Sequence, residues 1–127
     1  MDTYHEAMTQ LGRKVVQLLA LALNMPEDYF NQSFTKPIAL IRLLHYNETP
    51  SDPAAGILAA GAHTDYGMIT LLATDQEPGL QVFNEDSQEW IDVPPREGAF
   101  VVNLGDMLAQ WSNDLFHSAK KGSRLPF

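Results

Sequence analysis

The centre of this sequence holds the stretch His63-Thr64-Asp65-Tyr66-Gly67-Met68-Ile69-Thr70-Leu71-Leu72, a polar run that passes directly into an apolar one. Its first half places an imidazole and a carboxylate two residues apart, at His63 and Asp65. On an extended backbone, side chains at positions i and i+2 point to the same face. A histidine nitrogen and a carboxylate oxygen arranged in this way can occupy adjacent positions around one metal ion. The apolar half predicts a strand, so the stretch indicates a metal site in a β-rich fold.

The composition is that of one globular domain: 127 residues, 45% of them hydrophobic and 19% charged. Sixteen acidic residues against eight basic ones give a net charge of −8. This balance argues against a nucleic-acid partner, because phosphate binding needs clustered Lys and Arg. The apolar runs are too short to cross a bilayer, so no membrane-spanning segment is expected. No basic segment precedes an apolar one at the N-terminus, so no secretory signal peptide is expected. The absence of cysteine excludes disulfides and thiolate ligands and fits a cytoplasmic location.

Apolar periodicity predicts one long helix followed by several short strands. The helix is expected over residues 4–23, starting in a capping box at Thr3 and Glu6 and ending at Asn24 and Pro26. The predicted strands are 38–46, 68–73, 80–83, 90–93 and 99–103, with a loop at 47–56, a hairpin connection at 84–89 and a short helix at 104–111. Gly79 is expected at a turn with an unusual φ, and so is Gly105. Together these elements predict a mainly β fold with an N-terminal helix (α+β), of the jelly-roll kind.

Longer segments around the metal pair carry a family resemblance. They are Arg42-Leu43-Leu44-His45-Tyr46, Gly61-Ala62 running into the stretch quoted above, Pro78-Gly79-Leu80-Gln81-Val82, Trp90 with Val93-Pro94-Pro95, and Gly98-Ala99-Phe100-Val101-Val102-Asn103-Leu104-Gly105-Asp106-Met107-Leu108 running into Trp111-Ser112-Asn113-Asp114. In their order and spacing these segments resemble the isopenicillin N synthase-like family of Fe(II)/2-oxoglutarate-dependent oxygenases. The resemblance covers about two-thirds of the chain.

The resemblance implies an incomplete double-stranded β-helix (jelly roll). It divides the chain into an N-terminal helical segment (1–36), an incomplete oxygenase core (37–119) and a non-matching tail (120–127). It assigns His63 and Asp65 to Fe(II) and Tyr46 to the co-substrate 2-oxoglutarate. The alternative for Tyr46 is a strand tyrosine that faces a half-buried cleft. Asn103 and Asp106 also match the family, although a strand end and a helix N-cap would explain them.

The activity implied by the resemblance is the hydroxylation or desaturation of a small organic substrate with O2 and 2-oxoglutarate. A few relatives use no 2-oxoglutarate, so the co-substrate is the family's usual one. The three residues His63, Asp65 and Tyr46 are expected to share one cavity.

At the position of the family's third iron ligand, this chain departs from the family pattern. Counted from Ser118, the second histidine is expected at position 121, where this chain has Lys121, and Gly122 stands in place of the following arginine. A protonated lysine has no lone pair to offer a metal. His117 is the other candidate for the third ligand, and the alternative for it is an exposed strand histidine. The tail from residue 120 shows neither strand alternation nor helical periodicity.

Two functional hypotheses therefore stay open. The first is an Fe(II)/2-oxoglutarate oxygenase by descent, impaired in this chain. The second is a non-catalytic remnant or a binding module without the third ligand. The chain is expected to be a fragment of an oxygenase cut at both ends, with an open barrel, exposed strand edges and marginal stability. Altered splicing, a frameshift or a gene-model error would each account for the tail.

Overall fold

The computed structural model of the chain describes residues 1–46 and 51–123. The chain divides into two compact units, Met1–Leu44 and His45–Phe127. Part of the loop predicted for 47–56 and the last four residues of the predicted tail lie outside the described residues. Within the described part of the chain, no helix is both long and apolar enough to cross a membrane.

The first unit is built on the long helix that the apolar periodicity predicts. Helix α1 spans Asp2–Ala22. Asn24 follows it in the left-handed conformation, with φ of 56°, which confirms the predicted helix end. The predicted capping box is wrong, because the helix starts earlier: Met1 is the N-cap, no side chain caps it, and Thr3 lies inside the first turn.

The segment after the helix does not form the strand predicted for 38–46. A short 3₁₀ helix, η1 (Asn31–Phe34), leads into an extended stretch that has no ladder partner among the described residues. Its apolar side chains are open to solvent, with Ile38 91% and Leu43 81% exposed. The residues have strand propensity, but a strand is defined by pairing, and propensity alone does not supply a partner.

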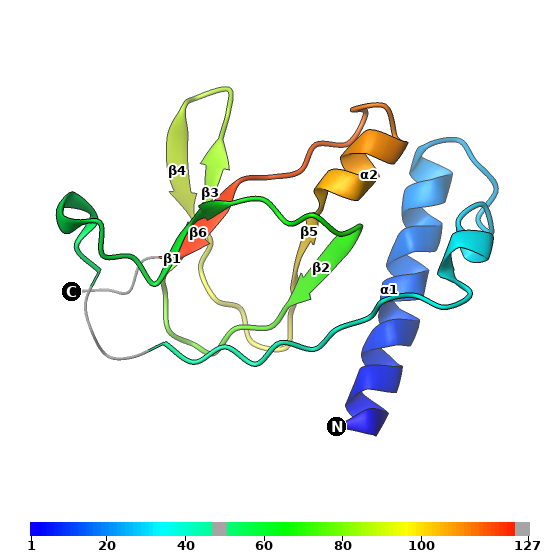
Figure 1. Cartoon of the computed structure of the whole chain (residues 1–127), viewed down its shortest axis with the longest axis horizontal. Coiled ribbons are helices and arrows are strands. Elements are labelled where there is room, and N and C mark those ends of the chain that lie inside the picture. Colours follow the sequence, from blue (N-terminus) through cyan, green and yellow to red (C-terminus); the bar gives the residue numbers. More distant parts are fainter. Residues whose placement is uncertain (47–50, 124–127) are drawn as a thin grey trace. The chain divides into compact units, whose positions relative to one another are not determined.

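The second unit contains two antiparallel sheets (Figure 1). Its elements in chain order are η2 (Pro53–Ala55), β1 (Ala60–His63), β2 (Ile69–Leu72), β3 (Leu80–Asn84), β4 (Glu89–Asp92), β5 (Val101–Leu104), α2 (Asp106–Trp111) and β6 (Lys121–Ser123). One sheet has the order β1-β6-β3-β4, and the other pairs β2 with β5. The strands predicted for 68–73, 80–83, 90–93 and 99–103 and the helix at 104–111 are confirmed within about two residues at their ends.

The start of the predicted tail forms a strand, contrary to expectation. β6 lies between β1 and β3, as Figure 1 shows near the red end of the colour scale. Its sequence, Lys-Gly-Ser, has little β propensity, so its conformation is set by hydrogen bonding to a neighbour on each side. Gly122 suits this position, because a Cβ there would come within 3.3 Å of the Ala60 carbonyl oxygen.

The hairpin is arranged as predicted. β3 and β4 pair in the register Phe83↔Trp90, and the turn between them is the predicted polar connection. Gly79, just before β3, has the predicted unusual φ, at 148°. Leu108 of α2 is fully buried and Met68 is 8% exposed. The mainly β class with an N-terminal helix is therefore confirmed.

Candidate functional site

His63 and Asp65 face each other at the end of β1. His63 is the last residue of that strand, and its Nε2 lies 3.8 Å from Oδ1 of Asp65. The other ring nitrogen, Nδ1, is 2.8 Å from the Gly61 carbonyl oxygen. When Nδ1 donates its hydrogen to that carbonyl, Nε2 keeps the lone pair that a metal needs, and the ring is fixed in orientation. The predicted same-side projection of this pair is confirmed.

The second oxygen of Asp65 is already engaged by three donors. Its Oδ2 accepts hydrogen bonds from Thr70 Oγ1 at 2.5 Å, from Asn103 Nδ2 at 2.8 Å and from Lys121 Nζ at 2.5 Å. Thr70 lies in β2, and Asn103 is its register partner in β5. The carboxylate that follows β1 is thus tied to both strands of the two-stranded sheet and to β6.

Lys121 reaches this site because of its place in the sheet. It is paired with His63 across β1 and β6, so the two side chains project to the same face. Its Nζ also donates to Asn103 Oδ1 at 2.7 Å. The lysine side chain is only 11% exposed, and that of Asp65 is 23% exposed. The ammonium and the carboxylate therefore form a largely buried, hydrogen-bonded pair.

The surroundings shift the pKa of Asp65. Burial by itself raises the pKa of this carboxyl, but the hydrogen bonds from Lys121, Thr70 and Asn103, together with the charge of Lys121, outweigh it. The net result lowers the pKa of Asp65 from 3.8 to about 2. The folded chain therefore favours the ionised carboxylate.

We expect the stability contributed by the ionised Asp65 to be complete above about pH 5 and lost as the pH falls toward 2. The pKa of Asp65 is about 2 in the folded chain and close to the ordinary value of 3.8 in the unfolded chain. On acidification the unfolded chain therefore takes up the proton first. Each pKa unit corresponds to about 1.4 kcal/mol, and partial exposure reduces this, so about 1 to 2 kcal/mol is at stake. Urea unfolding of the wild type and of Asp65→Asn between pH 7 and pH 2 measures it. A difference in unfolding free energy that stays constant over that range would contradict the expectation.

The backbone around Asp65 is held by the start of α2. The Asp106 amide donates to the Asp65 carbonyl oxygen at 2.7 Å, and the Gly105 amide donates to that of Met68 at 2.9 Å. Gly105, not Asp106, is the helix N-cap, so the prediction for Asp106 is wrong; the Asp106 carboxylate accepts a bond from Thr64 Oγ1 instead. Gly105 also lacks the predicted unusual φ, since its φ is −106°. Its constraint is a close approach, because a Cβ there would lie 2.1 Å from the Gly67 carbonyl oxygen.

These residues do not fit a three-ligand iron site. His63 and Asp65 supply two donors, but the expected third position holds an ammonium that already binds the carboxylate. Across residues 1–46 and 51–123, no three His, Cys, Asp or Glu side chains form a group that could hold a metal ion. His117 lies in the irregular segment before β6, exposed, and lines a surface groove beside the β3–β4 turn with residues such as Phe83, Glu85 and Lys120. It has no place in a metal-holding group of described residues.

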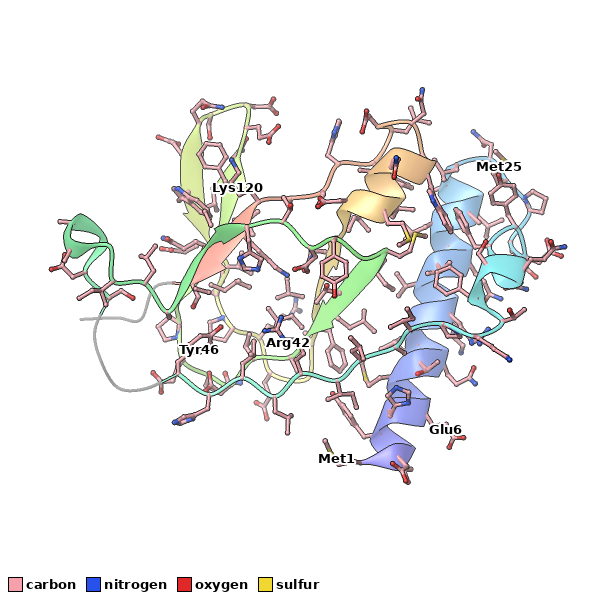
Figure 2. The ribbon with its side chains drawn as sticks, viewed as in Figure 1. Met1, Glu6, Met25, Arg42, Tyr46 and Lys120 are labelled. Carbon is pink, nitrogen blue, oxygen red and sulfur yellow. The ribbon has the colours of Figure 1, made fainter. Side chains whose placement is uncertain are left out.

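Tyr46 ends the extended segment ahead of the second unit's strands. Figure 2 shows it on the same segment as Arg42. Its side chain is 38% exposed. Its role toward 2-oxoglutarate stays a prediction, and so does the cavity that it is expected to share with His63 and Asp65.

Sequence reasoning missed the role of the two residues that complete the carboxylate's environment, Thr70 and the family match Asn103. The apolar pattern explains Thr70 only as part of a strand and Asn103 only as a strand end. The available signal was a lone hydroxyl in Ile69-Thr70-Leu71-Leu72 and a lone amide in the apolar strand β5. Isolated polar side chains within half-buried apolar strands favour a hydrogen-bond partner, and a nearby carboxylate supplies one.

Comparison with known proteins shows which sequences the chain is similar to. Residues 37–124 match the family model described as the 2OG-Fe(II) oxygenase superfamily. The chain is 41% identical over 116 residues to the "2-oxoglutarate-Fe(II) type oxidoreductase hxnY" of Emericella nidulans, covering 91% of this chain and 33% of that protein. It is 33% identical over 143 residues to the 1-aminocyclopropane-1-carboxylate oxidase of Dictyostelium discoideum, covering 91% of this chain and 39% of that protein. The chain thus spans about a third of the length of these curated relatives.

Solved structures agree with the fold. A full-length Neurospora crassa protein in complex with alpha-KG superposes with a TM-score of 0.89 and 37% identity, over 99% of this chain and 39% of that chain. JOX2 in complex with 2OG, Fe and JA gives a TM-score of 0.77 and 29% identity, over 98% of this chain and 36% of that chain. These neighbours confirm the predicted jelly-roll class, of which this chain contains a part.

Proposed function

Because the chain belongs to the 2OG-Fe(II) oxygenase superfamily, we propose that it is the iron-facing part of a fold that oxidises a small organic molecule with O2 and 2-oxoglutarate. The facing pair His63 and Asp65 supports this, since imidazole and carboxylate are two of the three ligand types in the iron triad. Hydroxylation or desaturation is the proposed reaction class. Tyr46 is the proposed contact for 2-oxoglutarate.

In the chain as it stands, we propose that Fe(II) binds weakly and that no substrate is turned over. The observation that carries this is the 2.5 Å contact between Lys121 Nζ and Asp65 Oδ2. Two unit charges of the same sign 4 Å apart repel by about 4 kcal/mol at an effective dielectric constant of 20, and a divalent ion doubles this. A metal bound to Oδ1 of Asp65, the oxygen that faces His63, would stand beside the ammonium held on Oδ2, and a lysine cannot serve as the missing third ligand.

A second candidate is a non-catalytic binding module on the same fold. The buried Lys121–Asp65 pair favours it, because that pair satisfies the site without a metal. A chain that binds a small organic molecule while showing no iron complex would support this candidate.

The proposed setting is cytoplasmic, with no nucleic-acid or membrane partner. The net charge of −8 supports the absence of a nucleic-acid partner, since a phosphate backbone attracts basic surfaces. The lack of cysteine is compatible with a reducing compartment.

We expect anaerobic addition of Fe(II) and 2-oxoglutarate to the chain to give no visible charge-transfer band. The Fe(II) affinity should be at least about 100-fold below that of an intact relative, because one ligand is lost and a like charge is added. The absorption spectrum and a metal titration measure this. The Emericella nidulans relative, treated identically, is the positive control. A clear band with this chain that His63→Ala abolishes would contradict the proposed inactivity.

A further inference from the structure

We propose that the Lys121 ammonium is a built-in cation that takes the structural place of a divalent metal, joining β6 to the β2–β5 sheet and making this fold independent of metal. The inference does not rest on the proposed oxygenase activity. It concerns stability and metal response, which are measured without co-substrate or substrate.

The position of Lys121 supports this role. In the four-stranded sheet it is opposite His63 on one side and opposite Val82 on the other. A strand on each side holds the backbone of a residue in the centre of a sheet, and this fixes the face to which its side chain points. The ammonium therefore lies on the same face as His63 and Asp65.

The contacts around the ammonium resemble those of a bound cation. Two oxygens contact Nζ: Asp65 Oδ2 at 2.5 Å and Asn103 Oδ1 at 2.7 Å. Asn103 also donates from its Nδ2 to the same carboxylate oxygen, at 2.8 Å, so the three side chains form a closed ring of hydrogen bonds. One positive charge meets one negative charge, and no further ion is needed for neutrality.

The contacts also join two sheets that no strand ladder connects within residues 51–123. Lys121 lies in the four-stranded sheet, whereas Asn103 and Thr70 belong to the two-stranded sheet. Asp65 lies between β1 and β2 and receives a bond from each of these three residues. Because the pair is largely buried, solvent and salt screen it less than a surface pair.

The test replaces the tethered cation by a ligand and follows melting with and without metal. In the wild type, EDTA and excess Co(II) should leave the melting temperature the same within about 1 °C. Lys121→His should melt roughly 10 °C lower in EDTA, since Asp65 loses its partner, and should regain most of that loss with Co(II). The Co(II) absorption of the variant should change on binding. Lys120→His is the matched control, because Lys120 is exposed on the neighbouring position and should behave like the wild type.

Lys121→Met tests the loss of the positive charge by itself, without adding a metal-binding side chain. It keeps an unbranched side chain but no cation, and it should melt below the wild type whether or not Co(II) is added. A Lys121→Met chain with the same melting temperature as the wild type would overturn the proposal. So would a wild type that Co(II) stabilises or EDTA destabilises, or a Lys121→His chain that Co(II) fails to stabilise.

Discussion

A Gly105→Ala substitution is expected to lower the unfolding free energy of the chain by about 3 kcal/mol, although the new side chain is a single methyl group. That methyl would lie 2.1 Å from the Gly67 carbonyl oxygen and 2.7 Å from the Asp65 carbonyl oxygen. Both contacts are with backbone, which cannot rotate away as a flexible side chain would. The loop or the helix start must move instead.

The expected loss comes from hydrogen bonds as well as from the clash. The amides of Gly105, Asp106 and Met107 donate to the carbonyl oxygens of Met68, Asp65 and Gly67, at 2.9, 2.7 and 3.2 Å. Moving the junction of β5 and α2 stretches all three bonds and shifts the backbone that positions Asp65. The Asp65–Lys121 pair should therefore weaken in the same variant.

Gly61→Ala is the matched control for this prediction. Gly61 lies in β1, its φ is not positive, and a Cβ there meets no atom within 4 Å. Its unfolding free energy should stay within about 0.5 kcal/mol of the wild type. Urea unfolding followed by circular dichroism compares the two variants. Equal urea midpoints for Gly105→Ala and Gly61→Ala would show that the start of α2 moves to accommodate the methyl group without loss of stability.

The parts of the fold that local sequence determines were predictable. The periodicity of α1 and the apolar strands β2 and β5 are local signals, and the β3–β4 hairpin has its turn between two clear strands. The two-residue spacing of His63 and Asp65 likewise predicted that their side chains lie close together. In each case the pattern and the structure depend on the same few neighbouring residues.

The parts that depend on distant partners were not predictable in the same way. β6 has the sequence Lys-Gly-Ser and is a strand because β1 and β3 flank it. The segment 38–46 has the opposite character, with strand-forming residues and no described partner. Strand assignment from propensity fails in both directions when pairing decides the outcome.

The role of Lys121 shows the same limit within the site. The sequence indicates that the lysine replaces an expected histidine and cannot bind a metal. It does not indicate that Asn103 and Asp65 converge on the ammonium, since these residues are 18 and 56 positions away from it. The structure adds that the charge of Lys121 is already paired with Asp65.

Asp65→Ala is expected to cost about 3 kcal/mol of unfolding free energy at neutral pH. The substitution removes the acceptor of three hydrogen bonds and leaves the Lys121 ammonium, with a side chain only 11% exposed, without its counter-charge. An unpaired buried charge is more costly than the loss of one ordinary hydrogen bond. Asp106→Ala is the matched control: that carboxylate is exposed and accepts a bond from the exposed Thr64, so its loss should cost about 1 kcal/mol or less.

A double-mutant cycle then tells the buried pair apart from two independent residues. Adding Lys121→Met to Asp65→Ala removes the stranded charge, so the double variant should lose less than the sum of the two single losses, by about 1 to 3 kcal/mol. Urea unfolding of the four proteins at pH 7 gives this coupling energy directly. Strict additivity would mean that the 2.5 Å contact does not stabilise the folded chain. A positive coupling that decreases steadily between pH 5 and pH 2 would assign it to the ionised carboxylate, because protonation of Asp65 removes the charge that the ammonium balances.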